Sequence, residues 1–429
     1  MRAVTGHLPL ALPFMRILLV CHRFPYPPDH GGKIRPFNVL RHLAPNHAVT
    51  VASIARCAAE AEAAKGIAPY CAEFMVGTVS APAAALRMIA RLPTPTPSSM
   101  GFFHSPDLAR RVRAAIARAP FDLIFVHTSS VAPYVQSAVS TPKIMDFCDM
   151  DSQKWLDFAR IKPFPLSLGY RLEGLKMMRA EKRIARAFDL CTCATPAELA
   201  TYEGYGTGTP GGVFPNGVDL DYFKGADAAY DPDRITFVGR MNYFPNEDAV
   251  VRFCNEILPR VRARRPNVSF TIVGADPGPK VRQLASLSGV TVTGTVPDVR
   301  PYVQSAALTV APIEIARGTQ NKILESMAMG VPAVASRTIA GGIDAVAGEH
   351  FLAAATPDAF ADAVLRLLEN PDERARFARA GRARVESHHS WAAAMARLDQ
   401  MIEGVMRGRA RPTDRSDSRS ASADASRQR

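Results

Sequence analysis

The sequence lacks the features that mark several protein classes. None of its seven cysteines forms a C-x-x-C pair, so we expect neither a disulfide framework nor a structural zinc site, and a reducing cytoplasm is the expected location. No stretch of about 18 or more residues is both uncharged and apolar, so no transmembrane helix is expected. The apolar opening of the chain is interrupted by Pro9, Pro13 and Arg16, unlike a signal peptide, and we expect the first strand to start at Met15.

An even excess of positive charge is also absent. The formal net charge is +12, but residues 1–229 hold 25 Lys and Arg against 18 Asp and Glu, residues 230–406 hold 20 against 19, and residues 407–429 hold 7 against 3. A uniformly basic nucleic-acid-binding protein would not have a neutral middle, and the chain shows no aromatic-rich basic platform or known reading motif. Nucleic acid is therefore not an expected partner.

The composition is that of an ordinary globular protein. Of the 429 residues, 47% are hydrophobic and 21% are charged, which is enough to bury a large core, and the length indicates two domains. Short runs rich in Val, Ile and Phe alternate with stretches of helical period, the pattern of parallel sheets covered by helices. Strands are predicted at residues 16–21, 49–54, 73–79, 122–127, 143–148 and 190–194, and again at 235–239, 270–274, 290–293, 308–311 and 333–336.

The segment 204–217 is dense in Gly, Pro and Thr, interrupts this alternation and predicts a domain boundary. The expected fold class is α/β, with two Rossmann-like, doubly wound parallel-sheet domains. We expect a flexible leader over residues 1–14, a first domain over 15–215, a second over 216–385, a helix over 386–406 that returns to the first domain, and a disordered basic tail over 407–429.

Two familiar patterns match the sequence without indicating their usual function. Gly206, Gly208 and Gly211 match the dinucleotide fingerprint G-x-G-x-x-G. That fingerprint needs a strand before it and a helix after it, whereas here a helix is predicted before it and Pro210 interrupts it. D-x-D triplets occur three times, so their presence does not by itself indicate a metal site. We expect no metal and no cofactor.

Two glycine-containing loops are predicted at the carboxyl ends of strands, where open α/β sheets bind ligands. Gly31 and Gly32 follow the first strand at a helix start, where backbone N–H groups and the helix dipole favour an anion; a plain tight turn is the alternative. Gly239 and Arg240 end the first strand of the second half, and the planar guanidinium of an arginine binds two phosphate oxygens at once.

Residues 311–332 carry the strongest signal and are predicted to form a strand, a glycine-containing loop, a helix and a further strand. Lys322 and Glu325 are three residues apart, so they share one face of the predicted helix. A lysine at a helix N-terminus beside Arg317 in the loop suits a diphosphate, and a carboxylate one turn later suits paired sugar hydroxyls. An ordinary surface salt bridge is the alternative.

Four segments in this order resemble the family-4 retaining glycosyltransferases of the GT-B fold, and the resemblance covers roughly residues 15–406. They are Gly31–Gly32, Pro-Asn-Gly-Val-Asp at 215–219, Phe-Val-Gly-Arg at 237–240, and Leu-Glu-Ser-Met-Ala-Met-Gly-Val-Pro at 324–332. Residues 21–29 and 149–155 further resemble a subgroup, the sugar transferases associated with exopolysaccharide clusters of PEP-CTERM/exosortase systems.

The resemblance implies two domains that face each other across a cleft, with a nucleotide-sugar donor held mainly by the second. It implies that Arg240 neutralises the donor diphosphate, that Glu325 binds the ribose, and that Gly32 approaches the transferred sugar. The donor-binding residues expected on this basis are Gly31, Gly32, Gly239, Arg240, Gly294, Val296, Gly318, Asn321, Lys322 and Glu325. The residues expected to be catalytic are Arg240, Asp149, Lys322 and Arg317.

The chain departs from the family's pattern in three places. Arg317 stands where the family often has a glutamate, with Glu314 three residues earlier, and residues 242–246 lack the usual lysine. Many relatives also place a histidine after the strand that corresponds to residues 143–148, where this chain has Asp146, Cys148, Asp149 and Asp151. Our hypothesis is that Arg317 and Lys322 supply the missing positive charge. Either Asp149 hydrogen-bonds the sugar, or this acidic cluster orients the acceptor.

The expected function is therefore a metal-independent, retaining transfer of a sugar to an exopolysaccharide or lipid-linked oligosaccharide. Catalysis would rest on stabilising the growing charge of the diphosphate and on aligning the acceptor. One alternative is a nucleotide-sugar epimerase of the same fold. Another is a non-catalytic nucleotide-sugar-binding protein, suggested by the missing glutamate and histidine.

Two predicted helices of the first half are strongly basic, at residues 110–118 and 171–186. The second interleaves its basic residues with Leu172, Leu175 and Met178, as an amphipathic helix does. One interpretation is a helix that lies on an anionic membrane surface, so that the protein is peripheral on the cytoplasmic membrane. The other is an ordinary helix that covers the sheet and exposes a charged face.

Overall fold

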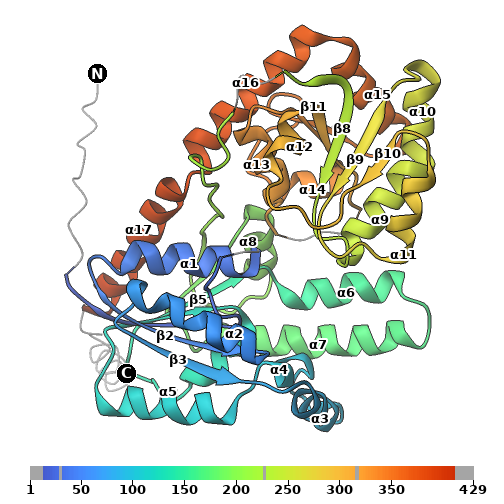
Figure 1. Ribbon diagram of the computed structural model, residues 1–429. Helices are drawn as coiled ribbons and strands as arrows, with labels where there is room; N and C mark the ends of the chain where they lie inside the picture. Colours follow the sequence, from blue (N-terminus) through green and yellow to red (C-terminus); the bar gives the residue numbers. More distant parts are fainter. Residues whose placement is uncertain (1–12, 29–30, 226–228, 315–317, 411–429) are drawn as a thin grey trace, which may run out of the picture.

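The computed structural model describes residues 13–28, 31–225, 229–314 and 318–410, which form two α/β domains stacked one on the other (Figure 1). Most of the expected leader, most of the expected tail and Arg317 lie outside these ranges. All seven cysteines are free, as expected. Within the described ranges, none of the helices has both the length and the apolarity needed to cross a bilayer.

The first domain is built on seven parallel strands in the order β3-β2-β1-β4-β5-β6-β7. The strands are β1 (Arg16–Cys21), β2 (Ala48–Ala55), β3 (Glu73–Thr78), β4 (Leu123–His127), β5 (Lys143–Cys148), β6 (Leu190–Cys193) and β7 (Gly211–Val213). Successive side chains of β1 are buried on opposite faces, so Ile17 and Leu19 belong to one hydrophobic core and Leu18 and Val20 to the other. Burial on both faces explains why this strand is a continuous apolar run.

Helices cover both faces of this sheet (Figure 1). They are α1 (Gly31–Leu43), α2 (Ala58–Ala63), α3 (Ala81–Arg91), α4 (Ser99–Phe102), α5 (Pro106–Arg118), α6 (Asp151–Ile161), α7 (Leu166–Ala185) and α8 (Pro196–Glu203), with 3₁₀ turns at Ala64–Tyr70 and Ser129–Val135. α6 and α7 form a hairpin that projects from the side of the domain (Figure 1). The glycines at 206 and 208 lie between α8 and β7, the reverse of the strand-to-helix order that a dinucleotide fingerprint needs.

The second domain has six parallel strands in the order β10-β9-β8-β11-β12-β13. The strands are β8 (Asp231–Val238), β9 (Ser269–Val273), β10 (Val290–Val292), β11 (Ala306–Ala311), β12 (Ala333–Ser336) and β13 (Leu352–Ala354). The helices are α9 (Phe244–Arg252), α10 (Leu258–Arg264), α11 (Pro279–Gln283), α12 (Arg300–Gln304), α13 (Asn321–Ala328), α14 (Arg337–Ala340), α15 (Pro357–Glu369) and α16 (Pro371–His388). A π-helical turn at Phe253–Ile257 joins α9 to α10 and a 3₁₀ turn at Leu284–Ser286 follows α11. Both sheets are therefore doubly wound in the Rossmann manner.

The last helix, α17 (Trp391–Ala410), packs on the first domain. Its apolar face lies in the same core as α1, and Asp399 Oδ1 is 2.8 Å from His42 Nε2 on α1. The chain thus crosses between the domains twice, and the two crossings run side by side because the Val218 N–H donates to the His389 carbonyl oxygen at 2.6 Å. The exact domain boundaries at 215/216 and 385/386 stay predictions.

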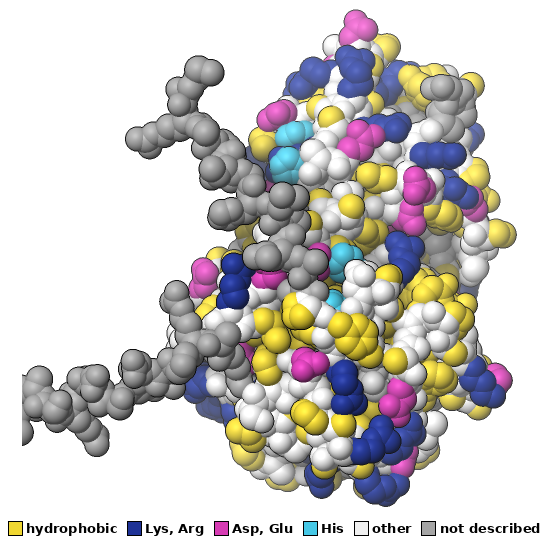
Figure 2. Space-filling view, turned by 90° about the vertical axis from the view of Figure 1, so that its left-hand side faces the viewer, with side chains coloured by type: hydrophobic (Ala, Val, Ile, Leu, Met, Phe, Trp, Pro, Cys, Tyr) yellow, Lys and Arg dark blue, Asp and Glu magenta, His cyan; other side chains and the backbone are white. Residues whose placement is uncertain are grey.

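Basic side chains are not gathered on the side of the molecule shown in Figure 2, where Lys and Arg are scattered among acidic and hydrophobic side chains. The excess of positive charge in the first half of the sequence therefore forms no single strip on this face.

Candidate functional site

Arg240 follows β8 at the carboxyl edge of the second sheet, and its side chain is 53% exposed. Its guanidinium donates to Asp276 Oδ2 at 2.7 Å, and Asn242 Nδ2 donates to the same oxygen at 3.0 Å. An exposed ion pair of this kind contributes little to stability, so Arg240 can exchange the carboxylate for an oxygen of a ligand at small cost.

Lys322 lies in the first turn of α13, with its ammonium 4.6 Å from the centre of the Phe237 ring. The ammonium donates to Asn246 Oδ1 at 2.6 Å, and Asn246 Nδ2 donates to the backbone carbonyl oxygen of Arg240 at 2.8 Å. Asn246 thereby joins the first turn of α13, which carries Lys322, to the loop that carries Arg240. A Cβ atom on Gly239 would lie 2.7 Å from Asn246 Nδ2, so a side chain at Gly239 would displace this link.

Glu325 lies one turn after Lys322, and both residues are partly buried. Burial lowers the pKa of Lys322 to about 7 and raises the pKa of Glu325 to about 7, while the attraction between the two charges opposes both shifts. A third, negative charge placed beside Lys322 would favour its protonated form. Binding of an anion beside Lys322 would therefore raise the pKa of this lysine.

The remaining predicted residues of the second domain lie along the same carboxyl edge. Gly294 has a φ of +69°, and together with Val296 it follows β10, two strands from β8. Asn321 begins α13, and its Oδ1 accepts a hydrogen bond from Asn216 Nδ2 at 3.3 Å. Asn216 belongs to the segment that connects the two domains, so the start of α13 is tied to that connection.

On the first-domain side, Gly31 and Gly32 are the first two residues of α1. A Cβ atom on Gly32 would lie 3.2 Å from Cδ of Arg23, so the glycine leaves room for this arginine. Burial lowers the pKa of Arg23, as do the positive charges of Arg56 and of Arg240 in the other domain. The positive charges of Arg56 in the first domain and Arg240 in the second are thus both felt at Arg23, and this concentration of positive charge favours an anionic ligand.

Four buried side-chain atoms near the carboxyl ends of β1, β4, β5 and β11 have no hydrogen-bond partner. They are His22 Nδ1, Thr128 Oγ1, Asp149 Oδ1 and Thr319 Oγ1. Thr128 has a φ of +75°, and Cys148, just before Asp149, has a φ of +64°. Buried polar atoms without partners and left-handed non-glycine residues are both unfavourable and cluster at ligand-binding sites.

Asp149 and Gly318, which come from different domains, meet directly. A Cβ atom on Gly318 would lie 2.1 Å from Asp149 Oδ1, and Gly318 has a φ of +73°. Burial, together with the negative charges of Glu198 and Asp151, raises the pKa of Asp149 to about 7. Asp149 is therefore partly protonated near neutrality, and can either donate a hydrogen bond to a ligand or accept one.

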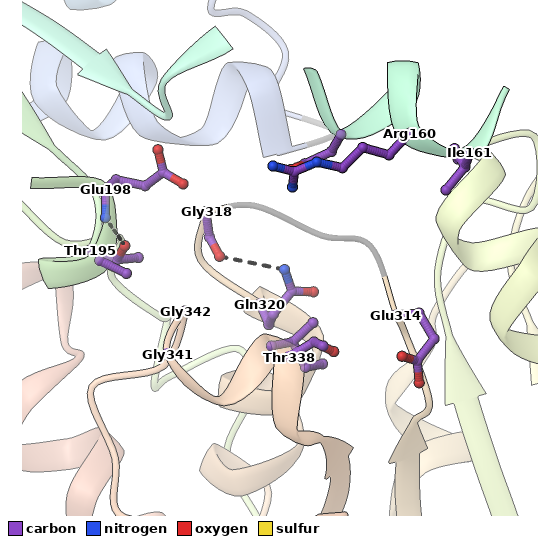
Figure 3. A pocket seen from close by; sticks show the side chains of 13 residues that line it. Arg160, Ile161, Thr195, Glu198, Glu314, Gly318, Gln320, Thr338, Gly341 and Gly342 are labelled. Carbon is purple, nitrogen blue, oxygen red and sulfur yellow. Dashed lines mark hydrogen bonds and ion pairs between the residues drawn. The ribbon is translucent and has the colours of Figure 1, made fainter. Parts of the chain in front are cut away.

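A pocket of about 360 Å³ lies between the domains (Figure 3). Arg160 and Ile161 of α6 and Glu198 of α8 line it from the first domain, and Gly318, Gln320 and Gly341 are among its lining residues from the second. Its size suits a small ligand. Among the predicted site residues that the structure describes, only Gly318 lines this pocket.

Glu314 also lines the pocket, but its carboxylate forms an ion pair with Arg252 of α9. It is therefore engaged within its own domain and does not simply replace the glutamate expected at position 317.

A buried polar network behind the site was not predicted from the sequence. Arg35 on α1 binds both carboxylate oxygens of Asp146 at 2.8 Å, and Asp146 also accepts from Thr192 at 2.9 Å and lies 2.8 Å from His127 Nδ1. Arg35 further donates to Asn216 Oδ1 at 2.9 Å. The pKa of Asp146 is held well below its usual range by Arg35 and His127, although burial alone would raise it. An aspartate inside the apolar run at 143–148 was the available signal, because a buried carboxylate needs a partner.

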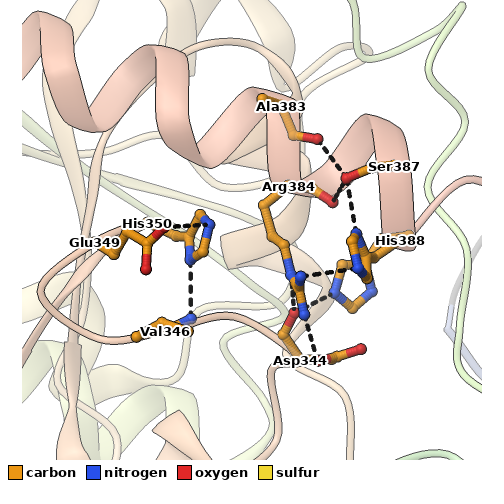
Figure 4. A network of polar contacts seen from close by, with 9 residues as sticks. Asp344, Val346, Glu349, His350, Ala383, Arg384, Ser387 and His388 are labelled. Atoms are coloured by element: carbon orange, nitrogen blue, oxygen red, sulfur yellow. Dashed lines mark hydrogen bonds and ion pairs between the residues drawn. The ribbon is translucent and has the colours of Figure 1, made fainter. Parts of the chain in front are cut away.

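The wall of the pocket on the second-domain side is held by a second network (Figure 4). Arg384 on α16 donates to the carbonyl oxygen and to Oδ1 of Asp344, both at 2.7 Å, and lies 2.8 Å from His388 Nε2. Asp344 lies two residues after Gly342, which lines the pocket together with Gly341. These contacts fix the loop after α14 to the helix that leads back to the first domain.

Comparisons with known proteins were made for the sequence and for the fold. Residues 232–370 match the sequence model of the family glycosyl transferases group 1. No curated protein matches the sequence significantly. The solved structures that share the fold include HepE from Anabaena in complex with UDP and glucose, a sucrose-phosphate synthase from Thermosynechococcus elongatus, and a UDP-forming α,α-trehalose-phosphate synthase from Burkholderia xenovorans.

These structural similarities extend over almost the whole chain. HepE is 16% identical with a TM-score of 0.64, and the match covers 91% of this chain and 99% of that one. The sucrose-phosphate synthase is 16% identical with a TM-score of 0.66 over 92% and 99% of the two chains. The trehalose-phosphate synthase is 11% identical with a TM-score of 0.60 over 92% and 100%. At these identities the similarity bears on the fold, and it confirms the expected GT-B architecture.

The narrower assignments to family 4 and to the PEP-CTERM/exosortase subgroup stay predictions. The chain has the GT-B fold and carries, over residues 232–370, a glycosyl transferases group 1 domain, which supports its identification as a glycosyltransferase.

Proposed function

We propose that the protein is a retaining glycosyltransferase that moves a sugar from a nucleotide-sugar donor to an exopolysaccharide or lipid-linked oligosaccharide, without a metal. The observation that carries the proposal is the link from Lys322 through Asn246 to Arg240. It links the loop after β8, which carries Arg240, to the first turn of α13, which carries Lys322, at the carboxyl edge of the second sheet and within the matched domain. A donor diphosphate bound there would meet one cation from the loop and one from the helix.

The other groups follow from this placement of the diphosphate. Glu325, one turn along α13, would accept hydrogen bonds from the ribose hydroxyls. Gly31 and Gly32, at the N-terminus of α1, would approach the sugar or its phosphate through backbone N–H groups. The unpartnered Asp149 Oδ1 would bind a hydroxyl of the sugar or of the acceptor. HepE, which has the same fold, was solved with UDP-glucose, so UDP-sugars are the first donors to test.

In the proposed reaction the bond between the anomeric carbon and the diphosphate oxygen breaks, and the acceptor oxygen bonds to the same carbon on the same face. The departing phosphate oxygen takes the proton of the acceptor hydroxyl, so no protein base is needed. Arg240 and Lys322 stabilise the negative charge that grows on the leaving group. The pocket between α6, α8 and α14 lies beside Gly318 and is the proposed entry for the acceptor.

The first experiment compares Arg240→Ala with a matched control, Arg260→Ala. Both arginines are about half exposed and each is paired with one aspartate, but Arg260 lies on α10 and pairs with Asp358. Removing a charge contact to the transition state typically lowers the rate about 10²–10³-fold. We expect that loss for Arg240→Ala with an unchanged melting temperature, and a normal rate for Arg260→Ala.

The assay uses a panel of UDP-, GDP- and ADP-sugars, each tested first for stabilisation of the protein and then for hydrolysis and transfer. A near-normal rate of Arg240→Ala would remove this residue from the site. The anomeric configuration of the product, read by NMR, tests the retaining mechanism. An epimerised donor without transfer would indicate the epimerase instead, and donor binding without turnover would indicate a non-catalytic binding protein.

A further inference from the structure

Half-exposed and exposed apolar side chains gather on one side of the first domain, on α3 and on the hairpin of α6 and α7. We call the following set the apolar strip: Leu86, Ile89 and Leu92 at α3, Phe164 in the hairpin turn, and Leu168 and Leu172 on α7. Their exposed fractions range from 50 to 81%. Scattered single apolar residues are normal on a protein surface, whereas a contiguous group marks an interaction site.

The two parts of the apolar strip are neighbours in space. Lys176, one turn after Leu172 on α7, donates to the backbone carbonyl oxygens of Arg91 and Leu92 at 3.3 and 2.7 Å. Residues 168, 172 and 176 share one face of α7, so this face leads from the contact with Leu92 toward the hairpin turn. In Figure 1, α3 lies below α7, and α6 lies between α7 and the second domain. α3 therefore lies on the side of α7 away from the second domain, whereas the hairpin turn lies close to that domain, because Lys162 Nζ is 4.3 Å from the centre of the Phe244 ring.

The charge around the apolar strip is positive. α3 contains Arg87 and Arg91 and no acidic residue. On α7 the exposed charged residues include Arg171, Arg179 and Arg183. The two carboxylates of α7 are engaged inward. Glu173 accepts from the N–H groups at residues 98 and 99 at 3.1 and 2.8 Å, and the buried Glu181 accepts from Ser152.

The other basic helix of this domain has a different surface. α5 carries Arg110, which pairs with Asp107 of the same helix at 2.5 Å, and Arg113, which is exposed. None of the large apolar side chains of α5 is exposed. Both α5 and α7 are therefore basic, but only α7 has exposed large apolar side chains beside its basic residues.

We propose that the apolar strip is the surface by which the protein docks on an anionic lipid bilayer. The aliphatic and phenyl side chains enter the boundary between headgroups and acyl chains, and the arginines beside them contact the lipid phosphates. The hairpin that carries the strip also supplies Arg160 and Ile161 to the pocket between the domains. Docking would thus bring that pocket close to the membrane surface, where a lipid-linked acceptor lies. The docking itself does not rest on the proposed function.

The test is flotation of the full chain with two kinds of vesicle, pure phosphatidylcholine and phosphatidylcholine of which a third is replaced by phosphatidylglycerol. We expect flotation with the second kind alone. The triple variants Leu86→Ser/Ile89→Ser/Leu92→Ser and Phe164→Ser/Leu168→Ser/Leu172→Ser should lose it. The control Val139→Ser changes an apolar side chain of the same domain that is 80% exposed but lies outside the strip, and should float normally.

The charge is tested separately. Arg171→Gln/Arg179→Gln should weaken binding about fivefold for each cation removed, whereas Arg110→Gln/Arg113→Gln on α5 should leave it unchanged. As a measurement that does not depend on multiple substitutions, Phe164→Trp should show a blue shift of its emission with anionic vesicles and none with neutral ones, after subtraction of the wild-type spectrum. Donor binding measured without vesicles reports the integrity of each variant.

The proposal is wrong if the wild-type protein does not bind anionic vesicles, or if both triple variants bind them as well as the wild type does. It is also wrong if the α5 variant loses as much binding as the α7 variant, because binding would then follow overall charge alone. Self-association that the triple variants abolish, without vesicle binding by the wild type, would assign the strip to a second copy of the chain instead.

Discussion

Substitution of Gly318 tests whether the approach of the two domains matters for the reaction. Gly318 has a φ of +73°, and a Cβ atom there would lie 2.1 Å from Asp149 Oδ1. Gly318→Ala therefore has two effects, a left-handed backbone that costs about 1–2 kcal/mol for an L-residue, and a steric overlap with a carboxylate of the other domain.

The size of the second effect follows from the distance. A carbon and an oxygen that are not bonded approach to about 3 Å at closest, so the loop at 318–320 and Asp149 must separate by roughly 1 Å. A displacement of about 1 Å between reacting groups costs about 100-fold in rate. The strain alone lowers the melting temperature of a domain of this size by about 2–4 °C per kcal/mol. We thus expect a large loss of transfer with a modest loss of stability.

Gly208→Ala is the matched control, because Gly208 has a φ of +79° and no neighbouring atom lies within 4 Å of the position that a Cβ would take there. Gly208→Ala introduces the same left-handed backbone strain without a steric overlap. It should therefore lose the same amount of stability as the strain alone costs Gly318→Ala, and it should keep its transfer rate. The assay is sugar transfer at saturating donor, with thermal unfolding of each variant. Equal transfer rates of the two variants would refute the reasoning, because the contact between Asp149 and Gly318 would then be irrelevant to catalysis.

Two further predictions concern charged groups. Because the pKa of Lys322 is lowered to about 7, its charge is present below that pH and is lost above it, so affinity for UDP-glucose in calorimetry should fall as the pH rises from about 6 to 8. Lys322→Arg should weaken this dependence, since arginine stays charged and only groups such as Glu325, whose pKa is also about 7, still titrate in this range; a flat wild-type profile would contradict the role of the lysine. Asp146→Asn should lower the free energy of unfolding by about 3–5 kcal/mol at neutral pH, because it leaves Arg35 buried and unpaired. Because the folded pKa of Asp146 is depressed, this contribution is present above the unfolded pKa and is lost as the pH falls; a loss below about 1 kcal/mol in urea unfolding would contradict the account.

Much of the fold is encoded in short stretches of sequence. β1, β5 and β12 begin and end at the predicted residues, because each is an apolar run closed by polar or glycine-containing segments. β7 and β13 were missed, since each is only three residues long, lies at a sheet edge and is rich in Gly or Ala. Between β8 and β9, α9, a π turn and α10 form one continuous helical segment.

The candidate site was harder to predict, because its contacts join distant parts of the chain. Arg240, Lys322 and Glu325 were recognisable from their loops and helix. Asn246, which lies 76 residues from Lys322, has no local signal for its role. The pair of Arg35 and Asp146 spans 111 residues. The pocket between the domains depends on how the domains are stacked, which no local pattern of the sequence specifies.

The position of α17 has a consequence for synthesis of the protein on the ribosome. The core of the first domain includes side chains of this helix, the last element that the structure describes. Chains grow at about 5–20 residues per second, so roughly 10–40 s pass between completion of β7 and emergence of α17. During that interval the surface against which α17 packs is open. The first domain therefore completes its core only after the second domain has been synthesised. A truncation that removes α17 would destabilise the first domain.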